Sequence, residues 1–568
     1  MPTTPEQLHA LFAEDWQWRL RDQPEWATVL GDHRYGDRLK DLSPQAIAGR
    51  RDHARDMLRR LSAIDRERLA GQDLLSYDLF RFEQQLAVDA SRFPLEALMI
   101  DQLDGPQLAL GQLVGFIPFR NADDYGKYIA RLRAYPRYLE QVTALLKRGI
   151  AERWVQPKGP LASIPAQIDG QIVKDLSGAP LFEPFERIPH GVSHDERAAL
   201  AKAGEKAIRD SVFPALAAFR DFVQNTYLPA GDRAIGAHAL PDGKDYYAFA
   251  SRRATTTTLT PQQVHDIGRA EVVRIRAEME AVVRKSGFQG SFAEFLNFLR
   301  TDPRFYYTRA DDLVSGYRDI AKRADAELPK LFAVLPRNTY GVRPFPDYEA
   351  PSQTTARYYP GAADGTRPGY FMVNTYRLSA RPKYEMEALT LHEAVPGHHL
   401  QFSRAQELTD LPDFRRNAEY VAYVEGWALY CESLGETMGF YKDPYSKFGQ
   451  LTYEMWRACR LVVDTGIHAL SWSRQRAINF MKENTAKSEQ DIAVEVDRYI
   501  VWPGQALAYK IGELKIKELR AKAEQRLGKA FDVRRFHNAL LDNGPLPLDL
   551  LQQEIDRWIA AHATQEKP

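Results

Sequence analysis

The chain has 568 residues, enough for several ordinary domains, yet no stretch has the composition of a linker, so we expect one large unit or two closely packed lobes. Lysine plus arginine and aspartate plus glutamate number 76 each, and the resulting zero net charge gives no indication of a nucleic-acid or membrane partner.

The two cysteines, Cys431 and Cys459, are too few for a disulfide framework and lack the paired spacing of a metal-binding thiol site. The first residues, Met1 to Gln7, carry neither a basic nor an apolar segment, and no later stretch is long and apolar enough to cross a membrane. We therefore expect a soluble cytoplasmic chain, or a periplasmic one if an export signal has been removed.

The first part of the chain has a helical pattern. In residues 5–150, charged and apolar residues recur at three and four positions, which predicts helices throughout, with a break at 101–106. Residues 152–194 contain six prolines and are expected to be irregular. A long helix is predicted from Asp195 to about Tyr227.

Two later helices have recognisable starts. Thr260 is followed by Gln263, and Ser291 is followed by Glu294, each at the spacing of a capping box. Both are structural signals, so we assign neither a catalytic role.

Between about Phe332 and Asn374 the helical period is lost. Arg357 to Tyr359 and Gly369 to Asn374 read as two short strands joined by a turn-rich segment, which predicts a small β-sheet. An edge strand here could pair with an extended peptide through main-chain hydrogen bonds, so Tyr359 and Asn374 are candidate substrate-binding residues.

From Tyr384 to the end the pattern is helical again, and we find no internal repeat. The predicted helices are Asn417 to about Met438, Lys447 to about Ser471, Arg474 to Thr485, Ser488 to Tyr499, and Ala506 to about Leu527.

One stretch, Thr390 to Gln401, concentrates chemistry-bearing side chains: His392, Glu393, His398 and His399. Neutral imidazoles are good ligands for zinc, and an adjacent glutamate can take a proton from metal-bound water. The usual zinc-protease helix places its second histidine four residues after the first, on the same helical face. Here that place is occupied by Pro396.

The second histidine ligand is therefore a geometric question. On an ideal helix His398 lies about 240° around the axis from His392, whereas His399 lies about 20° from eclipsing it but roughly 10 Å further along. Pro396 and Gly397 should widen the helix locally and bring His398 back towards the metal. We favour His398 as the second ligand, with His399 as the alternative.

A catalytic zinc needs a third protein ligand, and Glu425 is the candidate. Its neighbours along the predicted helix are apolar, and a buried carboxylate without a partner is costly, so a metal would be a suitable partner. The alternative is that Glu425 pairs with an arginine such as Arg457 or Arg460.

Several ordered motifs together resemble the bacterial domain-of-unknown-function 885 family. This family is distantly similar to the helical zinc peptidases that include angiotensin-converting enzyme and the thermostable bacterial carboxypeptidases. The motifs are Leu30 to Arg34, the His-Glu-x-x-Pro-Gly-His-His run from His392 to His399, Glu425 to Tyr430, Asp464 to His468, and Pro503 to Tyr509.

The resemblance implies a mainly α-helical, two-lobed shell around a deep cleft, with the small β-sheet next to the zinc helix. The lobes would span about 1–330 and about 331–568. It also implies that a tyrosine and a histidine from later helices stabilise the oxyanion of the reaction, and Tyr509 and His468 match these by order in the chain. The alternatives are a core tyrosine and a histidine bonded to Asp464.

Arg457, Arg460 and Arg498 could bind a terminal carboxylate of the substrate, although arginines of this kind also form buried structural ion pairs. We expect a zinc-dependent peptidase acting on short peptides, with Zn²⁺ held by His392, His398 and Glu425 and with Glu393 as general base. The alternatives are a zinc amidase or esterase for a small metabolite, and a metal-free scaffold that binds peptides or a protein. The oligomeric state is not specified by the sequence.

Overall fold

The computed structural model describes residues 3–231, 234–346, 350–351, 353–363, 365 and 367–563. The described chain is mainly helical and contains one small three-stranded sheet, as the sequence predicts. It forms two compact units: Met1–Ile235 with Ala239–Pro241, and Gly236–His238 with Asp242–Pro568.

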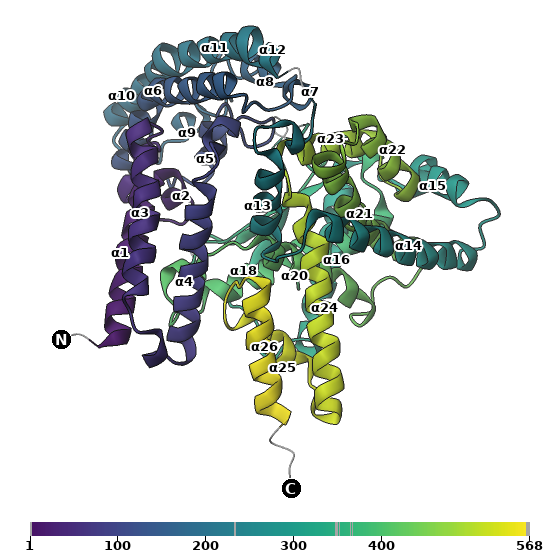
Figure 1. Ribbon diagram of the computed structural model, residues 1–568. Coiled ribbons are helices and arrows are strands. Elements are labelled where there is room, and N and C mark those ends of the chain that lie inside the picture. Colours follow the sequence, from purple (N-terminus) through teal and green to yellow (C-terminus); the bar gives the residue numbers. More distant parts are fainter. Residues whose placement is uncertain are drawn as a thin grey trace. The chain divides into compact units, whose positions relative to one another are not determined.

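The secondary structure elements in the described part of the first unit are all helices. Three of its helices, α1, α3 and α4, run side by side, and the long helix α6 packs against α10 and α11 (Figure 1). Its helices are α1 (Thr4–Asp22), α2 (Pro24–Val29), α3 (Pro44–Ser62), α4 (Gly71–Ala90), α5 (Ala109–Val114), α6 (Ala122–Glu152), α7 (Lys158–Leu161), α8 (Ile164–Asp169), α9 (Glu183–Glu186), α10 (His194–Ala207), α11 (Phe213–Phe222) and α12 (Leu228–Ala230).

The break predicted at 101–106 is confirmed, and the long helix predicted from Asp195 is a continuous helical run. Two π-helical turns, Ile208–Val212 and Val223–Tyr227, interrupt the α-helical bonding within that run. The proline-rich segment 152–194 is mostly irregular but contains three short helices. Two of these, α8 and α9, carry a proline in the first turn, where its lack of an N–H group removes no hydrogen bond of the helix.

The second unit contains the sheet and the longest buried helix. Its elements are α13 (Gly243–Thr255), α14 (Pro261–Lys285), α15 (Phe292–Thr301), α16 (Ala310–Glu327), β1 (Tyr340–Pro344), β2 (Ala356–Tyr359), β3 (Gly369–Val373), α17 (Met386–Glu393), α18 (His398–Gln406), α19 (Asp413–Arg416), α20 (Val421–Ser433), α21 (Pro444–Leu470), α22 (Arg474–Asn484), α23 (Glu489–Val501), α24 (Ala508–Leu527), α25 (Val533–Leu541) and α26 (Leu548–Ala563).

Helix α21 is the centre of this unit. Every residue from 448 to 468 is buried, and α14, α17 and α22 pack against it. Because polar groups buried on this helix must find partners, they form ion pairs with neighbouring helices. Lys510, fully buried on α24, contacts Glu271, Glu454 and Glu513 and so joins α14, α21 and α24.

This packing explains why the division of the chain differs from the expected one. The sequence suggested a change of lobe near residue 330, whereas the compact units divide near residue 241. Helix α14 lies along α21, so residues 242–330 belong with the C-terminal part. Both predicted capping boxes, at Thr260 and Ser291, are present at the starts of α14 and α15.

The sheet has the strand order β1-β3-β2. The two predicted strands are confirmed as β2 and β3, which pair antiparallel with Ala356 opposite Val373. The sequence analysis missed β1, which pairs parallel to β3. Strand β2 lies at one edge of the sheet and packs against α17, so the sheet adjoins the His-Glu helix as expected.

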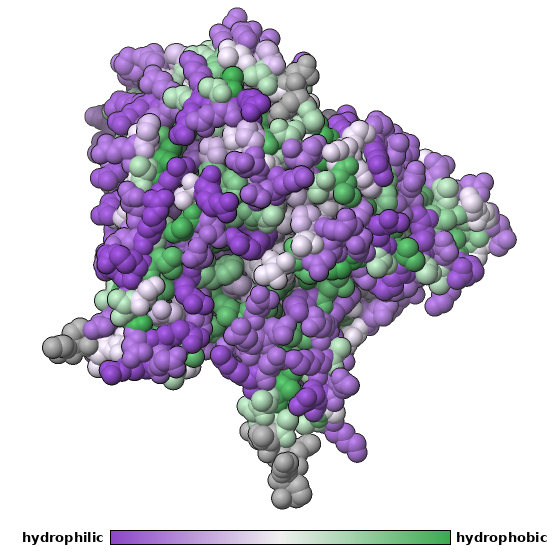
Figure 2. All heavy atoms as spheres, in the orientation of Figure 1, coloured by the Kyte–Doolittle hydropathy of each residue, from purple (hydrophilic) through white to green (hydrophobic). Residues whose placement is uncertain are grey.

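The described helices include none with the length and apolar content needed to span a membrane. The face of the molecule in Figure 2 is largely hydrophilic, with apolar side chains scattered in small groups.

Candidate metal centre

The His-Glu helix ends abruptly and a second helix begins six residues after His392. Helix α17 stops at Glu393, the Val395–Pro396 peptide bond is cis, and α18 starts at His398. The expected local widening of one continuous helix is therefore wrong, because the chain leaves the helix and re-enters it. A side chain at Gly397 would place its Cβ 1.9 Å from the carbonyl oxygen of His392, so this turn requires glycine.

The turn is fixed to the helix that carries the third candidate ligand. The indole Nε1 of Trp427 on α20 donates a hydrogen bond of 2.9 Å to the carbonyl oxygen of Pro396. Glu425 lies two residues earlier on α20, so the same helix holds both the turn and this carboxylate.

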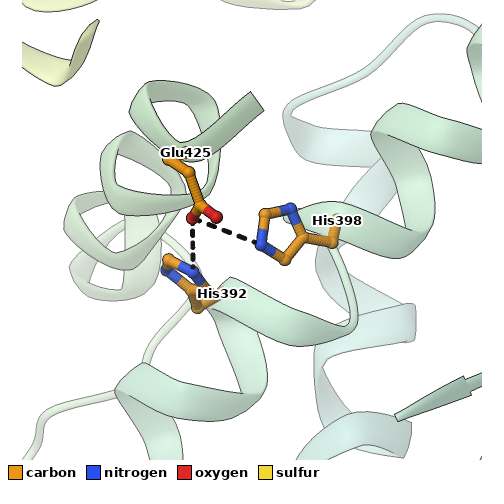
Figure 3. Close-up of side chains that lie close together, drawn as sticks. All are labelled: His392, His398 and Glu425. Atoms are coloured by element: carbon orange, nitrogen blue, oxygen red, sulfur yellow. Dashed lines mark ion pairs between the residues drawn. The ribbon is translucent and has the colours of Figure 1, made fainter. Parts of the chain in front are cut away.

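Three side chains from α17, α18 and α20 point towards one another: His392, His398 and Glu425 (Figure 3). The Oε2 atom of Glu425 lies 3.4 Å from Nε2 of His392 and 3.6 Å from Nε2 of His398. The potential ligand atoms all lie within 4.8 Å of one another. His392 and His398 are buried, and the Glu425 side chain is 18% exposed.

The two contacts of Glu425 match one geometric requirement of a zinc site. Ligand atoms about 2.0–2.1 Å from one ion at tetrahedral angles lie about 3.3 Å apart, close to these distances of 3.4 and 3.6 Å. The Oε2 atom of Glu425 is buried and accepts no hydrogen bond from any described residue, as a ligand atom awaiting a cation would. Two imidazoles and one carboxylate are ligand types that catalytic zinc sites use, whereas structural zinc sites are usually closed by four ligands.

A second carboxylate orients the first histidine. The Nδ1 atom of His392 lies 2.8 Å from Oε1 of Glu432, which is fully buried and also contacts Arg457 at 3.3 Å. Such a carboxylate fixes the ring so that Nε2 presents its lone pair to a metal. The Nδ1 atom of His398 is buried without a partner among the described residues, so only one of the two histidines has this support.

Glu432 is not among the residues predicted from the sequence. It follows Glu425 by seven residues, two helical turns along the same face of α20, and this spacing was a signal that both carboxylates face the histidines.

The mutual pairing shows in the pKa values. Burial alone would lower the pKa of His392, but the carboxylates of Glu425 and Glu432 outweigh it and raise that pKa to about 9. Burial would raise the pKa of Glu425, and the two histidines instead hold it well below its usual value. The cluster thus attracts positive charge, the condition under which a cation competes with protons.

Glu393, the candidate general base, is the last residue of α17 and lies next to His392 in the chain. It is buried, with 8% of its surface exposed, and within the described ranges its carboxylate forms no hydrogen bond or ion pair. A carboxylate in this state is available to bind a water or a substrate group.

His399, the alternative ligand, lies outside the cluster. Its Nδ1 accepts a hydrogen bond of 2.8 Å from the hydroxyl of Tyr358, and its Nε2 lies 3.2 Å from the carbonyl oxygen of Asn338. Burial lowers its pKa to about 4. Both ring nitrogens are therefore used in joining α18 to the sheet region.

Tyr509 lies beside the cluster. Helices α20 and α24 cross closely at Gly426 and Gly512, where a Cβ on Gly426 would lie 2.5 Å from the Gly512 backbone. This crossing brings the first turn of α24, with Tyr509, next to Glu425. Burial and the negative charge of Glu425 both raise the pKa of Tyr509, so its hydroxyl remains protonated and can donate.

The three candidate arginines form ion pairs near Tyr509. Arg457 contacts Glu432, whereas Arg460 and Arg498 both contact Oε2 of Glu495, at 3.0 and 2.9 Å. The pairing of Glu425 with Arg457 or Arg460, considered as an alternative, is not found, because Glu425 faces the two histidines.

The structure does not place His468 for an oxyanion role. Its Nδ1 accepts a hydrogen bond of 3.0 Å from the amide of Ala237, and its Nε2 lies 2.9 Å from the carbonyl oxygen of Tyr499. Its expected alternative partner, Asp464, instead accepts hydrogen bonds from Tyr247 and Gly504. Both ring nitrogens of His468 serve the packing of α21.

Asn374 is also structural. Its side-chain amide donates to the carbonyl oxygens of Ala350, Gln353 and Thr354 and is buried, so it is not available to a substrate. Tyr359 ends the edge strand β2 and is half-buried.

Comparisons with known proteins give the following matches. The sequence model of a family described as a bacterial protein of unknown function, DUF885, matches residues 24–555. No curated protein matches the chain. A crystal structure from Colwellia psychrerythraea, provisionally described as a lipoprotein, is 27% identical and superposes with a TM-score of 0.93 over 99% of this chain and 100% of that one.

A second solved structure, from Shewanella oneidensis, is provisionally described as a lipoprotein of unknown function. It is 18% identical, with a TM-score of 0.70 over 97% of this chain and 99% of that one, and it shows the shared fold alone.

Proposed function

The chain belongs to the bacterial DUF885 family of unknown function, and within that family we propose that it is a zinc-dependent hydrolase that cleaves short peptides. The single observation that carries the proposal is the convergence of His392, His398 and Glu425 on one point, with Glu432 behind His392. Structural ion pairs rarely combine two imidazoles around one carboxylate oxygen with a second carboxylate that supports one of the imidazoles.

His392, His398 and Glu425 would hold the ion, and zinc, when bound, supplies a Lewis acid and lowers the pKa of a bound water. Glu393 accepts the proton of the attacking water and passes it to the leaving amine. The hydroxyl of Tyr509 donates a hydrogen bond to the oxyanion of the tetrahedral intermediate. His468 has no part in this scheme.

The resemblance of the motifs to helical zinc peptidases supports peptides as substrates over other amides and esters, and it supports a two-lobed peptidase shell as the finer architecture. A panel of dipeptides and acyl amides of equal size separates the peptidase from an amidase or esterase. The description of the 27% identical neighbour as a lipoprotein supports a location in the cell envelope.

The decisive test combines metal analysis with Glu393→Gln. We expect about one zinc per chain in both wild type and E393Q, and a fall in kcat of roughly 10²–10⁴-fold in the variant, because only the general base is removed. Glu436→Gln, at an exposed carboxylate paired with Lys447, is the control and should leave both unchanged. A wild-type rate in E393Q rejects the mechanism, and a chain that takes up no zinc on reconstitution favours the metal-free scaffold.

The two adjacent histidines provide a second test. His398→Ala should lower zinc content after dialysis well below one equivalent, because it removes a ligand. His399→Ala should lower the thermal midpoint through the lost contacts with Tyr358 and Asn338 and keep the zinc. The opposite pattern, zinc lost only in His399→Ala, would assign the ligand to His399.

A further inference from the structure

A second buried cluster, which the proposed mechanism does not use, adjoins the candidate metal centre. Tyr453, Arg457 and Arg460 lie on one face of α21, at spacings of four and three residues. The guanidinium of Arg460 lies over the ring of Tyr509, 4.3 Å from its centre, and that of Arg457 lies 6.0 Å from the same centre. The ring of Tyr509 therefore contacts this face, and the charge of Glu425 acts on the same tyrosine.

The charges of this cluster are not balanced. Three guanidinium groups, those of Arg457, Arg460 and Arg498, are 3–6% exposed and face two carboxylates, Glu432 and Glu495. Glu432 is also shared with His392. A buried cation without a matching anion is costly, so a folded chain that retains this arrangement gains from a further anion.

Specific donor atoms are also unused. The pair with Glu495 occupies Nη2 of Arg460 and the hydroxyl of Tyr499 occupies its Nε, but its Nη1 is buried without a partner in the described part of the chain. The same holds for Nε of Arg457 and for the hydroxyl of Tyr453. A purely structural ion-pair network would leave fewer such donors, since most buried polar groups are hydrogen-bonded.

We infer that Arg460 and Arg457 bind a carboxylate of the substrate, so that this hydrolase acts on peptides with a free carboxyl terminus close to the cleaved bond. The inference rests on the proposed function for the cleavage, and on the unbalanced arginines alone for the carboxylate. Guanidinium groups present paired donors that match carboxylate oxygens, and the half-buried Tyr509 marks the side from which the ligand would enter.

The test compares N-acetyl-Ala-Phe with N-acetyl-Ala-Phe-amide on the zinc-loaded chain. We expect kcat/KM for the acid to exceed that for the amide by about 100-fold, as loss of a buried charge pair does elsewhere. Arg460→Met should remove about 100-fold from kcat/KM for the acid and less than about 3-fold for the amide. Arg474→Met, at a partly exposed arginine paired with Asp497, is the matched control and should change neither.

Two further measurements decide the remaining cases. If circular dichroism shows that R460M is unfolded, Arg460→Lys replaces it as the test variant. The lysine keeps the charge but lacks the paired N–H donors of the guanidinium group, so the preference for the acid should still fall about 10-fold. Calorimetry with N-acetyl-Phe and its amide on the zinc-depleted chain tests binding without turnover. Only the acid should bind, and its binding should be about 10-fold weaker in R460K.

The outcomes separate the two proposals. Selective binding of the acid without hydrolysis of either peptide would keep the carboxylate site and reject the hydrolase. Hydrolysis of acid and amide at equal kcat/KM, or an unchanged preference in the Arg460 variants, would overturn the carboxylate site and keep the hydrolase.

Discussion

At the scale of single residues, the partners of each side chain separate the candidate functional groups from the structural ones. The ring nitrogens of His399 and His468 are both used in contacts with main chain or hydroxyl groups, which leaves none for chemistry. Glu393 is buried and forms no such contact in the described residues, and Oε2 of Glu425 faces the two candidate ligands His392 and His398. A buried group without a partner costs stability, and this cost is accepted most readily where a ligand supplies the partner.

The first prediction concerns Glu432, the carboxylate behind His392. Glu432→Gln keeps an acceptor for the His392 ring but removes the negative charge, so zinc affinity should fall about 10–100-fold. Competition with a chelator of known zinc affinity measures this change. Glu436→Gln, just beyond the end of the same helix and exposed, should leave the affinity unchanged. Equal zinc affinities in E432Q and wild type would show that Glu432 acts only as the ion-pair partner of Arg457.

Sequence reasoning could identify His392, His398 and Glu425 as candidates because their residue types and order match metal-ligand chemistry. It could not decide how the turn at Pro396 directs His398, since that depends on the hydrogen bond from Trp427, thirty-one residues away in the chain. It could not exclude His468 either, because the contacts of its ring come from Ala237 and Tyr499, and neither is close in sequence.

At the scale of secondary structure elements, the site depends on how closely helices approach. Helix α20 supplies Glu425 and Glu432 on one face and meets α24 through Gly426 on another. Glycine at both Gly426 and Gly512 allows the backbones to touch, and this sets the distance between Glu425 and Tyr509. The consecutive residues Glu425, Gly426 and Trp427 therefore supply a candidate ligand, the helix crossing and the hydrogen bond to the turn.

The second prediction tests this crossing. Gly426→Ala would place a methyl group 2.5 Å from the Gly512 backbone, so the helices must separate, and we expect a loss of about 1–3 kcal/mol of stability. Gly126→Ala in α6 is the control, because no atom lies within 4 Å of the added Cβ and a gain of about 0.4–1 kcal/mol is expected. Thermal melts compare the two. A Gly426 variant as stable as wild type would mean that the crossing is loosely packed.

The helices were predictable and the sheet was only partly so, for physical reasons. The start of a long amphipathic helix such as α14 is marked by capping residues, and these are visible in the sequence. Strands β2 and β3 follow one another in the chain and are predictable from their own residues, but β1 pairs in parallel across a long connection and contains Gly341 and Pro344. Its strand character comes from its partner rather than from its own residues.

At the scale of the whole molecule, the second unit is held together by buried charges as well as by apolar packing. Lys510 joins three helices through carboxylates, and Arg460 and Arg498 share Glu495. The sequence could not indicate that residues 242–330 join this unit, because ion pairs such as Lys510 with Glu271 connect residues far apart in the chain. The stability of such a unit should depend on pH through the groups whose pKa values folding shifts most.

Among groups outside the candidate metal centre, Asp464 has a pKa that burial raises strongly. It is fully buried on α21, accepts hydrogen bonds from the Tyr247 hydroxyl at 2.6 Å and the Gly504 amide at 3.1 Å, and burial raises its pKa to about 7. In the unfolded chain an aspartate has a pKa of about 3.9. Between these values the unfolded chain releases a proton that the folded chain retains, so rising pH favours unfolding.

The third prediction follows from this loss of stability with rising pH. The contribution of Asp464 is fully present below about pH 4 and is lost as pH rises towards 7, with a slope of at most about 1.4 kcal/mol per pH unit. Asp464→Asn cannot titrate, so the stability of wild type minus that of D464N should fall steadily between about pH 4.5 and 6.5. Urea unfolding at several pH values measures this difference and cancels the opposite contributions of buried histidines such as His399. A difference that is constant or rises with pH would mean that Asp464 is ionised in the folded protein.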